Sequence, residues 1–460
     1  MLRIRACLLL AVTLAAACTS GSGSSSAPPS AAGVYSFPPA PSVPSGDLTP
    51  EAEDAVGRLG PSLLAGSFDI GALRVVGRSE DARLGWFVSD LLRFVPPGRE
   101  QDELVGAFVS LTGVDPRDDP EFVASPWRSV TDHLIVWDLP APPGYRELKS
   151  GLFLEVEPGW EPFFSDADAE IDWRLLSWGG VFIDDRPLGD RRPCPGGCIP
   201  ALDDPPLTDA DRGNWYPDER IVFGVVIEDE AVAFPKNLME VHEMVNITIG
   251  GRRLGIPYCT LCGSVQAYYT DRVPRGIDTP VLRTSGLLSR SNKVMYDLIT
   301  SSVFDTFTGR ALSGPLQDAG VELPQATVVT STWGEWKQAH PDTRILAEDG
   351  GIGETYPLDP LGGRDDDGPI FPIGQADQRL GVQELIVGVI TPDGSPVAFP
   401  AEDAHAAIDA GEVVEAGGVE LFTDGGGLRA RLLDGPELAA HQAFWFAWSQ
   451  FHPDTVLWTR

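Results

Sequence analysis

Positive charge is scarce in this sequence of 460 residues. Lys and Arg together number 34 against 67 Asp and Glu, so the formal net charge is −33. A surface of this charge repels nucleic-acid phosphates and anionic headgroups, which excludes nucleic-acid binding and a polybasic membrane patch. The sequence also lacks a GxxxxGK[ST] phosphate loop and a GxSxG nucleophile elbow. It therefore gives no support to nucleotide hydrolysis or to the commonest serine-hydrolase design.

Long apolar runs are missing too, except for one near the start. A short basic stretch precedes the apolar run 6–17, which is shorter than the roughly 20 residues that a membrane-spanning helix needs and is typical of a signal peptide. The run ends in Ala-Ala-Ala-Cys at 15–18, which is similar to the lipobox of bacterial lipoproteins. We expect 1–18 to be a lipoprotein signal peptide with Cys18 as the lipidated residue, and the Ser/Gly/Pro-rich residues 19–49 to be a disordered tether.

This segment predicts a protein of the cell envelope, outside the cytoplasm and held to the membrane by a lipid on Cys18. Plain secretion is the alternative. Either compartment is oxidising, so disulfides persist there. Of the six cysteines, two belong to the expected signal segment, and the four others form two closely spaced pairs, Cys194 with Cys198 and Cys259 with Cys262.

The remaining chain divides by its hydrophobic pattern into an α+β protein. Apolar residues recur at helical spacing over 50–134 and predict a module of about four helices. Short aromatic and β-branched runs such as 151–157 predict a connecting segment with short strands over 135–215. Glycine (50) and proline (41) are abundant, and alternating apolar residues predict a mostly β domain over 216–460.

Two phrases recur within that domain. A hairpin pattern near 220–235 is repeated near 385–400, and Trp-x-x-Trp-x-x-x-His-Pro-Asp-Thr occurs at 333–343 and at 445–455. This order predicts two degenerate repeats, over about 218–346 and 380–460.

Each Trp/His phrase places two Trp residues and one His on one face of a helix that ends at His-Pro. His340 and His452 are therefore expected at helix C-termini, either as caps beside core Trp residues or, as the alternative, as ligands.

The sharpest local signal is Tyr-Cys-Thr-Leu-Cys-Gly-Ser at 258–264. Together with His-Glu-x-Val-Asn at 242–246, Ser-Asn-x-x-Met-Tyr-Asp at 291–297 and the two Trp/His phrases, it resembles the bacterial family named domain of unknown function 3179 over about 216–460. The resemblance implies membership but no activity. Thr260 stands where that motif usually has Pro.

The pair Cys259 and Cys262 is open to three interpretations. A Cys-x-x-Cys-Gly bend can direct two sulfurs to one ion, and His242 is a candidate third ligand, with His340 or His452 more speculative. Thiolate and imidazole ligands suit zinc or copper. The second interpretation is a disulfide, either structural or a redox couple, although the strand pattern after Cys262 lacks the helix that activates thioredoxin-type thiols. The third is a pair of buried, inert thiols. Cys194 and Cys198 are candidates for a disulfide that closes a Pro/Gly-rich loop, or alternatively for a four-thiolate site with Cys259 and Cys262.

Three functional hypotheses follow. The first is metal binding by Cys259, Cys262 and His242, with zinc or copper as the cofactor. The second is a non-catalytic binding or scaffolding module with structural disulfides. The third is a thiol-disulfide oxidoreductase. The sequence identifies no substrate and no protein or small-molecule partner.

Overall fold

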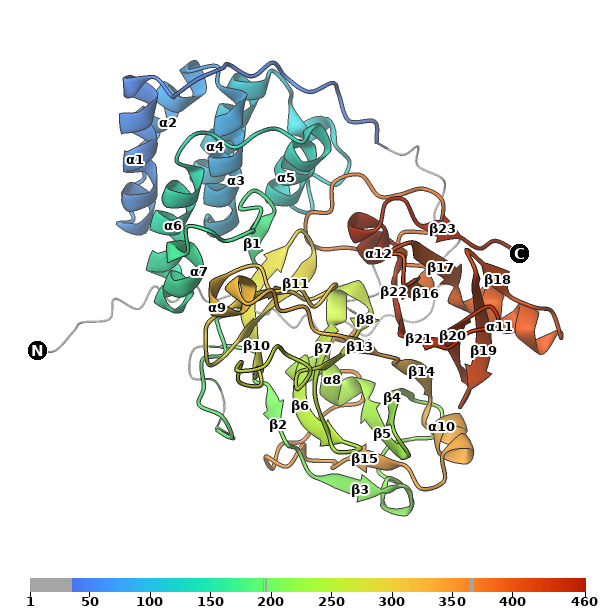
Figure 1. Cartoon of the computed structure of the whole chain (residues 1–460). Helices are drawn as coiled ribbons and strands as arrows, with labels where there is room; N and C mark the ends of the chain where they lie inside the picture. Colours follow the sequence, from blue (N-terminus) through green and yellow to red (C-terminus); the bar gives the residue numbers. More distant parts are fainter. Residues whose placement is uncertain (1–34, 193, 195–196, 364–367) are drawn as a thin grey trace, which may run out of the picture. The chain divides into compact units, whose positions relative to one another are not determined.

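The computed structural model describes residues 35–192, 194, 197–363 and 368–460 (Figure 1). The expected signal peptide, Cys18 and most of the expected tether lie outside these residues. Within the described ranges, no helix is both long enough and apolar enough to cross a membrane.

The first part of the described chain is helical, as the spacing of its apolar residues predicts. The helices are α1 (Pro50–Leu64), α2 (Ile70–Arg78), α3 (Gly85–Phe94), α4 (Arg99–Thr112), α5 (Pro126–Trp137), α6 (Tyr145–Val156) and α7 (Glu161–Ser165). Local sequence sets their starts: the Thr49 side chain caps α1 and Ser125 caps α5, and each cap is followed by Pro at the first helical position, where its missing N–H has no helical partner to lose.

Helix continues beyond residue 134, which corrects the expected start of a β-containing segment. Residues 151–157 lie mostly in α6, and the buried positions of that helix are Tyr145, Lys149, Leu152 and Phe153. Those positions follow the i, i+4, i+7, i+8 pattern of a helix. The short apolar run alone does not separate helix from strand, and the longer window decides for helix.

Strands of the described chain form five sheets (Figure 1). The first contains β1 (Leu176–Trp178), β10 (Leu282–Ser289), β11 (Asn292–Asp297) and β12 (Val303–Asp305). The second has the order β13 (Gln325–Ala326), β9 (Ala267–Tyr269), β7 (Arg252–Cys259), β6 (Met244–Ile249) and β2 (Leu202–Asp203), with β8 (Ser264–Val265) also paired to β7. The third has the order β14 (Val329–Thr332), β4 (Ile221–Ile227), β5 (Glu230–Pro235), β15 (Arg344–Leu346) and β3 (Leu207–Asp209).

The last two sheets come from the C-terminal part. One has the order β22 (Ala440–Phe444), β16 (Leu385–Ile390), β17 (Pro396–Pro400) and β23 (Val456–Leu457), and the other runs β18 (Glu415–Ala416), β19 (Val419–Asp424), β20 (Gly427–Leu432) and β21 (Glu437–Leu438). Short helices connect the strands: α8 (Lys236–His242), α9 (Gly314–Asp318), α10 (Trp333–Ala339), α11 (Ala401–Asp409) and α12 (Trp445–Phe451).

The sheets have a propeller-like arrangement, which corrects the prediction of a domain built from two repeats. The recurring phrases mark only matching strands in two sheets: β14-β4-β5-β15 and β22-β16-β17-β23 share their order, and β15 and β23 each pair in parallel with the preceding hairpin. The sheet β1-β10-β11-β12 is not marked by either phrase. Recurring residues therefore could not reveal it.

Each Trp/His phrase forms the helix that the spacing predicts, and each helix ends at its His. The indole of Trp336 lies over Gly224, and that of Trp448 lies over Gly388, so close that a Cβ on either glycine would be within 2.6 Å of ring atoms. The indole N–H of Trp336 donates to the Thr343 hydroxyl at 2.9 Å. The phrase thus packs a helix on its own sheet and closes the following turn.

The helices share their core with the first sheet. Leu287, Val294 and Tyr296 of the first sheet are buried in the same apolar cluster as α1 to α6. The connecting segment before β16 is fixed to α5, since the Asp132 carboxylate accepts the N–H groups of Ile373 at 2.8 Å and Gly374 at 2.7 Å. Residues Phe37–Arg460 form one compact unit, so the predicted boundaries at 134 and 216 do not separate independently packed parts.

Candidate functional site

His242 is the last residue of α8, as its position before the β6 strand predicts, and its ring is fully engaged. Nδ1 lies 2.7 Å from the Pro200 carbonyl oxygen and Nε2 lies 2.7 Å from the Tyr356 hydroxyl. Because a carbonyl only accepts, Nδ1 carries the proton and Nε2 accepts from Tyr356. Burial lowers the pKa of His242 to about 4, so the ring is neutral and neither nitrogen is free for a metal.

Cys259 and Cys262 frame a tight bend. Cys259 ends β7, the 3-10 turn η5 (Thr260–Cys262) follows, and Gly263 adopts a left-handed conformation with φ of 57°. The two cysteines are disulfide-bonded, with their Cα atoms 5.3 Å apart. Their residues are 3% and 0% exposed, in an apolar cluster with Phe307 and Trp448. Gly263 supplies the backbone bend that the sequence predicts, but the sulfurs bond to each other.

The structure does not bring the predicted metal ligands together. Among the described residues, the group of three or more His, Cys, Asp or Glu ligand atoms close enough to hold one ion consists of Asp184, Cys194 and Cys198. His340 Nε2 lies 3.0 Å from Asp424 Oδ1, and the His452 ring lies against Trp448 with centroids 4.4 Å apart. Both histidines therefore act as the helix ends that the first interpretation expects.

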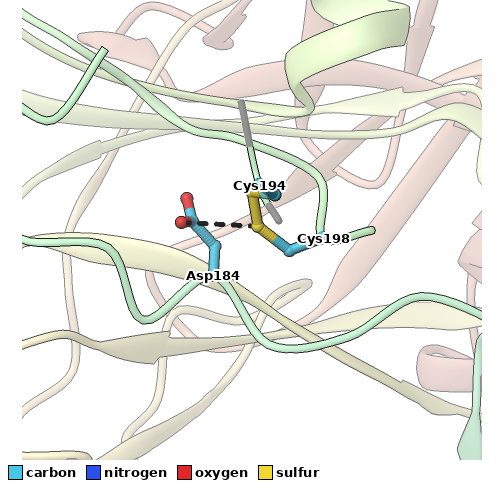
Figure 2. Close-up of side chains that lie close together, drawn as sticks. All are labelled: Asp184, Cys194 and Cys198. Carbon is cyan, nitrogen blue, oxygen red and sulfur yellow. Dashed lines mark hydrogen bonds between the residues drawn. A yellow bond between two sulfur atoms is a disulfide. The ribbon is translucent and has the colours of Figure 1, made fainter. Parts of the chain in front are cut away.

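The Asp184 carboxylate lies beside the disulfide of Cys194 and Cys198 (Figure 2). Cys194 and Cys198 are disulfide-bonded, as predicted, and Cys198 Sγ lies 3.7 Å from Asp184 Oδ1. The Asp184 carboxylate is fully buried and already accepts from Arg186 Nε at 2.6 Å, Arg186 Nη2 at 3.0 Å and the Ala201 N–H at 2.8 Å. A carboxylate neutralised by a guanidinium and sulfurs bonded to each other do not fit a metal ion.

A pocket adjoins the Cys259–Cys262 bend. Its volume is about 200 Å³, and the two residues between the cysteines, Thr260 and Leu261, form part of its wall. The rest of the wall comes from the ends of β1 and α8, from the β10–β11 hairpin and from the segment before β16. Its apolar side chains are Val181, Ile199, Leu261, Leu287, Leu288, Val294, Leu361 and Phe371.

Two carboxylates lie in the wall of this pocket: Glu240, which pairs with Lys236 at 3.2 Å, and Glu243, which pairs with Lys293. Lys293 Nζ lies 2.9 Å from Glu243 Oε2 and donates to the Glu243 carbonyl oxygen at 2.6 Å. The Thr260 hydroxyl donates to Glu243 Oε1 at 3.1 Å. Glu243 is the C-cap residue of α8, with a φ of 51°. Apolar walls with a few convergent polar groups are typical of small-molecule sites.

Sequence reasoning missed Lys293 and Glu243 as partners. Glu243 lies next to the candidate ligand His242, and Lys293 interrupts an otherwise largely uncharged strand, 292–296. A charged residue inside a strand that is buried on both faces almost always has a partner, and this signal was available in the sequence. The partner itself was not, because the two residues are 50 positions apart.

These observations define a class of protein: a helical part that shares its core with the first of five sheets in a propeller-like arrangement, with two short-range disulfides and a pocket beside the Cys-x-x-Cys bend. The chain belongs to the family described as protein of unknown function (DUF3179), whose model matches residues 196–435. This match confirms the resemblance that the motifs indicate. Searches of curated proteins and of solved structures found no match to the chain.

Proposed function

We propose that this chain is a non-catalytic binding protein of the cell envelope, anchored through Cys18, that holds a small and mostly apolar ligand in the pocket beside Cys259 and Cys262. The single observation that supports this function is the wall of the pocket. A closed disulfide fixes the bend that contributes Thr260 and Leu261, so the site is already shaped before a ligand arrives.

This proposal replaces metal binding as the preferred function. Zinc or copper at Cys259, Cys262 and His242 would require two thiolates and a free ring nitrogen. The closed disulfide and the two hydrogen bonds of His242 oppose that set. A thiol-disulfide oxidoreductase is disfavoured as well, because an attacking thiolate must reach a sulfur and these sulfurs belong to residues that are at most 3% exposed.

The first test is a count of free thiols and an elemental analysis of the full-length protein, purified without chelator or affinity metal. We expect no free thiol among the four cysteines after Cys18, and no stoichiometric zinc or copper. One equivalent of metal that disappears in Cys259→Ser would overturn the proposal in favour of a metal site. A Cys259–Cys262 bond that mild dithiol reductants open in the folded protein would favour the redox alternative.

The second test concerns the pocket itself. Benzyl alcohol serves as a small apolar probe, and its binding is followed by saturation-transfer NMR. Leu261→Trp adds a large ring at the wall and should remove the signal. Leu188→Trp, at a position that is 56% exposed and outside the pocket, is the matched control and should leave it unchanged. Equal binding by all three proteins, or by none, contradicts a site at this position.

A further inference from the structure

Lysine is much rarer than arginine in this chain. The sequence contains four Lys among its 34 basic residues, at positions 149, 236, 293 and 337. Two of them are buried, since the side chains of Lys149 and Lys293 are 1% and 6% exposed. Of these two, Lys293 lines the pocket beside the Cys259–Cys262 bend.

The surroundings of Lys293 are those of a reactive amine. Lys293 lines a mostly apolar cavity of about 200 Å³, and the carboxylate of Glu243, which can exchange protons, lies 2.9 Å from its Nζ. Burial lowers the pKa of Lys293, and this effect exceeds the opposite effect of the Glu243 charge. A lysine that is desolvated in an apolar pocket is a known form of activated nucleophile.

Lys149 shows what a purely structural buried lysine looks like in the same chain. Its Nζ lies 2.8 Å from Asp90 Oδ1 and 3.2 Å from the Tyr145 hydroxyl, and it packs over the rings of Tyr145 and Phe153 in the helical core. It does not line the pocket that contains Lys293. The two sites therefore differ in one respect: Lys293 lines this cavity and Lys149 does not.

We propose that Lys293 is an amine nucleophile that captures a small apolar aldehyde or ketone in this pocket as a Schiff base, with Glu243 as the group that moves protons. The proposal rests on the pocket being a ligand site, as the proposed function states, and adds covalent chemistry to it. The ligand class follows from the site: apolar walls for the body of the molecule, and one amine for its carbonyl carbon.

The reaction balances without any further reagent. Glu243 takes one proton from the Lys293 ammonium, and the free amine attacks the carbonyl carbon. The carbonyl oxygen then gains the proton that the attacking nitrogen gives up. The resulting carbinolamine loses its hydroxyl as water, with the proton for that step supplied by Glu243, and a C=N bond forms. One amine and one carbonyl thus give one imine and one water, with no change in oxidation state.

The experiment is reductive trapping. The full-length protein is incubated with benzaldehyde and sodium cyanoborohydride at neutral pH, where this reagent reduces an imine but not the free aldehyde, and peptide mass spectrometry then measures benzylation at each of the four lysines. We expect Lys293 to be modified at least about tenfold faster than the partly exposed Lys236 and Lys337, which pair with Glu240 and Asp218, as its lowered pKa and proton-transfer partner require, and Lys149 not to react. Modification of Lys293 no faster than that of Lys236 overturns the proposal.

Two further measurements keep the result interpretable. Lys293→Met leaves Glu243 buried without its partner and can unfold, so Glu243→Gln is the second variant: it should still be labelled at Lys293, but roughly 100-fold more slowly. An unchanged rate in Glu243→Gln contradicts the proton-transfer role. If benzyl alcohol binds while benzaldehyde leaves Lys293 unmodified, the pocket stands and the Schiff base is refuted. If neither probe has an effect, both proposals fail.

Discussion

Replacing His242 by Gln should remove part of the acid sensitivity of this protein. The folded chain holds this imidazole neutral, because burial lowers its pKa from 6.5 to about 4. In the unfolded chain, the ring takes up a proton below about pH 6.5. Between these two values the unfolded state binds more protons than the folded state, so stability falls as the pH is lowered.

The magnitude follows from the two pKa values. A difference of about 2.5 units at roughly 1.4 kcal/mol per unit gives about 3 kcal/mol at a pH well below 4. At pH 5, where the folded ring is still mostly neutral, the loss relative to pH 8 is about 2 kcal/mol by the same linkage. The residue is 1% exposed, so screening by solvent reduces this value little.

The assay is urea unfolding of the wild-type protein and of His242→Gln at pH 8 and pH 5. The quantity of interest is the difference in unfolding free energy between the two proteins, which should shrink by about 2 kcal/mol on going to pH 5. The difference between the two proteins is used because Asp132 is present in both. Burial raises the pKa of Asp132 to about 7, so this residue makes the folded protein more stable as the pH is lowered, which is opposite to the effect of His242.

His405→Gln is the matched control. Its ring lies on α11 with a side chain that is 36% exposed, so the same substitution there removes no buried imidazole and shows what the change from His to Gln does by itself. A difference between wild type and His242→Gln that is equal at pH 8 and pH 5 refutes the reasoning. It would mean that the ring is charged when folded or is not buried between Pro200 and Tyr356.

Three other changes give direct readouts. Thr343→Val leaves the buried indole N–H of Trp336 without an acceptor, and should lower the unfolding free energy by about 1–3 kcal/mol; a loss below 0.5 kcal/mol by chemical unfolding would contradict that bond. Gly224→Ala places a methyl group against the Trp336 ring, and should lower the unfolding free energy by about 1–3 kcal/mol or more. An unchanged melting temperature would show that the Trp336 helix does not pack on Gly224. Cys18→Ala should move the protein from the detergent phase to the aqueous phase in Triton X-114 partition, and its retention with detergent would exclude a lipid on Cys18 as the anchor.

Local features of the fold could be predicted from the sequence, because short-range rules determine them. The β4–β5 hairpin, the ends of α10 and α12 at His340 and His452, and the bend at Gly263 all follow from spacing and turn chemistry. The number of sheets could not be predicted, since it depends on pairing between strands far apart, such as β1 with β10, and no local pattern states which strands pair.

The candidate site shows the same division. The sequence draws attention to Cys259, Cys262 and His242. The bend between the two cysteines forms part of the pocket wall. The sequence does not show that the two ring nitrogens of His242 form hydrogen bonds with Pro200 and Tyr356, because neither partner is within 40 residues of it. Ligand sets depend on long-range contacts, whereas a Cys-x-x-Cys motif reports only that two sulfurs are near each other.

The core shared by helices and sheets has a practical consequence for work on this family. The matched region, 196–435, begins after α7 and ends before β22 and α12. A fragment with those ends would uncover the face of the first sheet that α1 to α6 bury, and would remove both strands that flank the β16–β17 hairpin. The stretch that the family model matches is therefore shorter than the compact unit 37–460, and expression should begin near residue 37 and continue to residue 460.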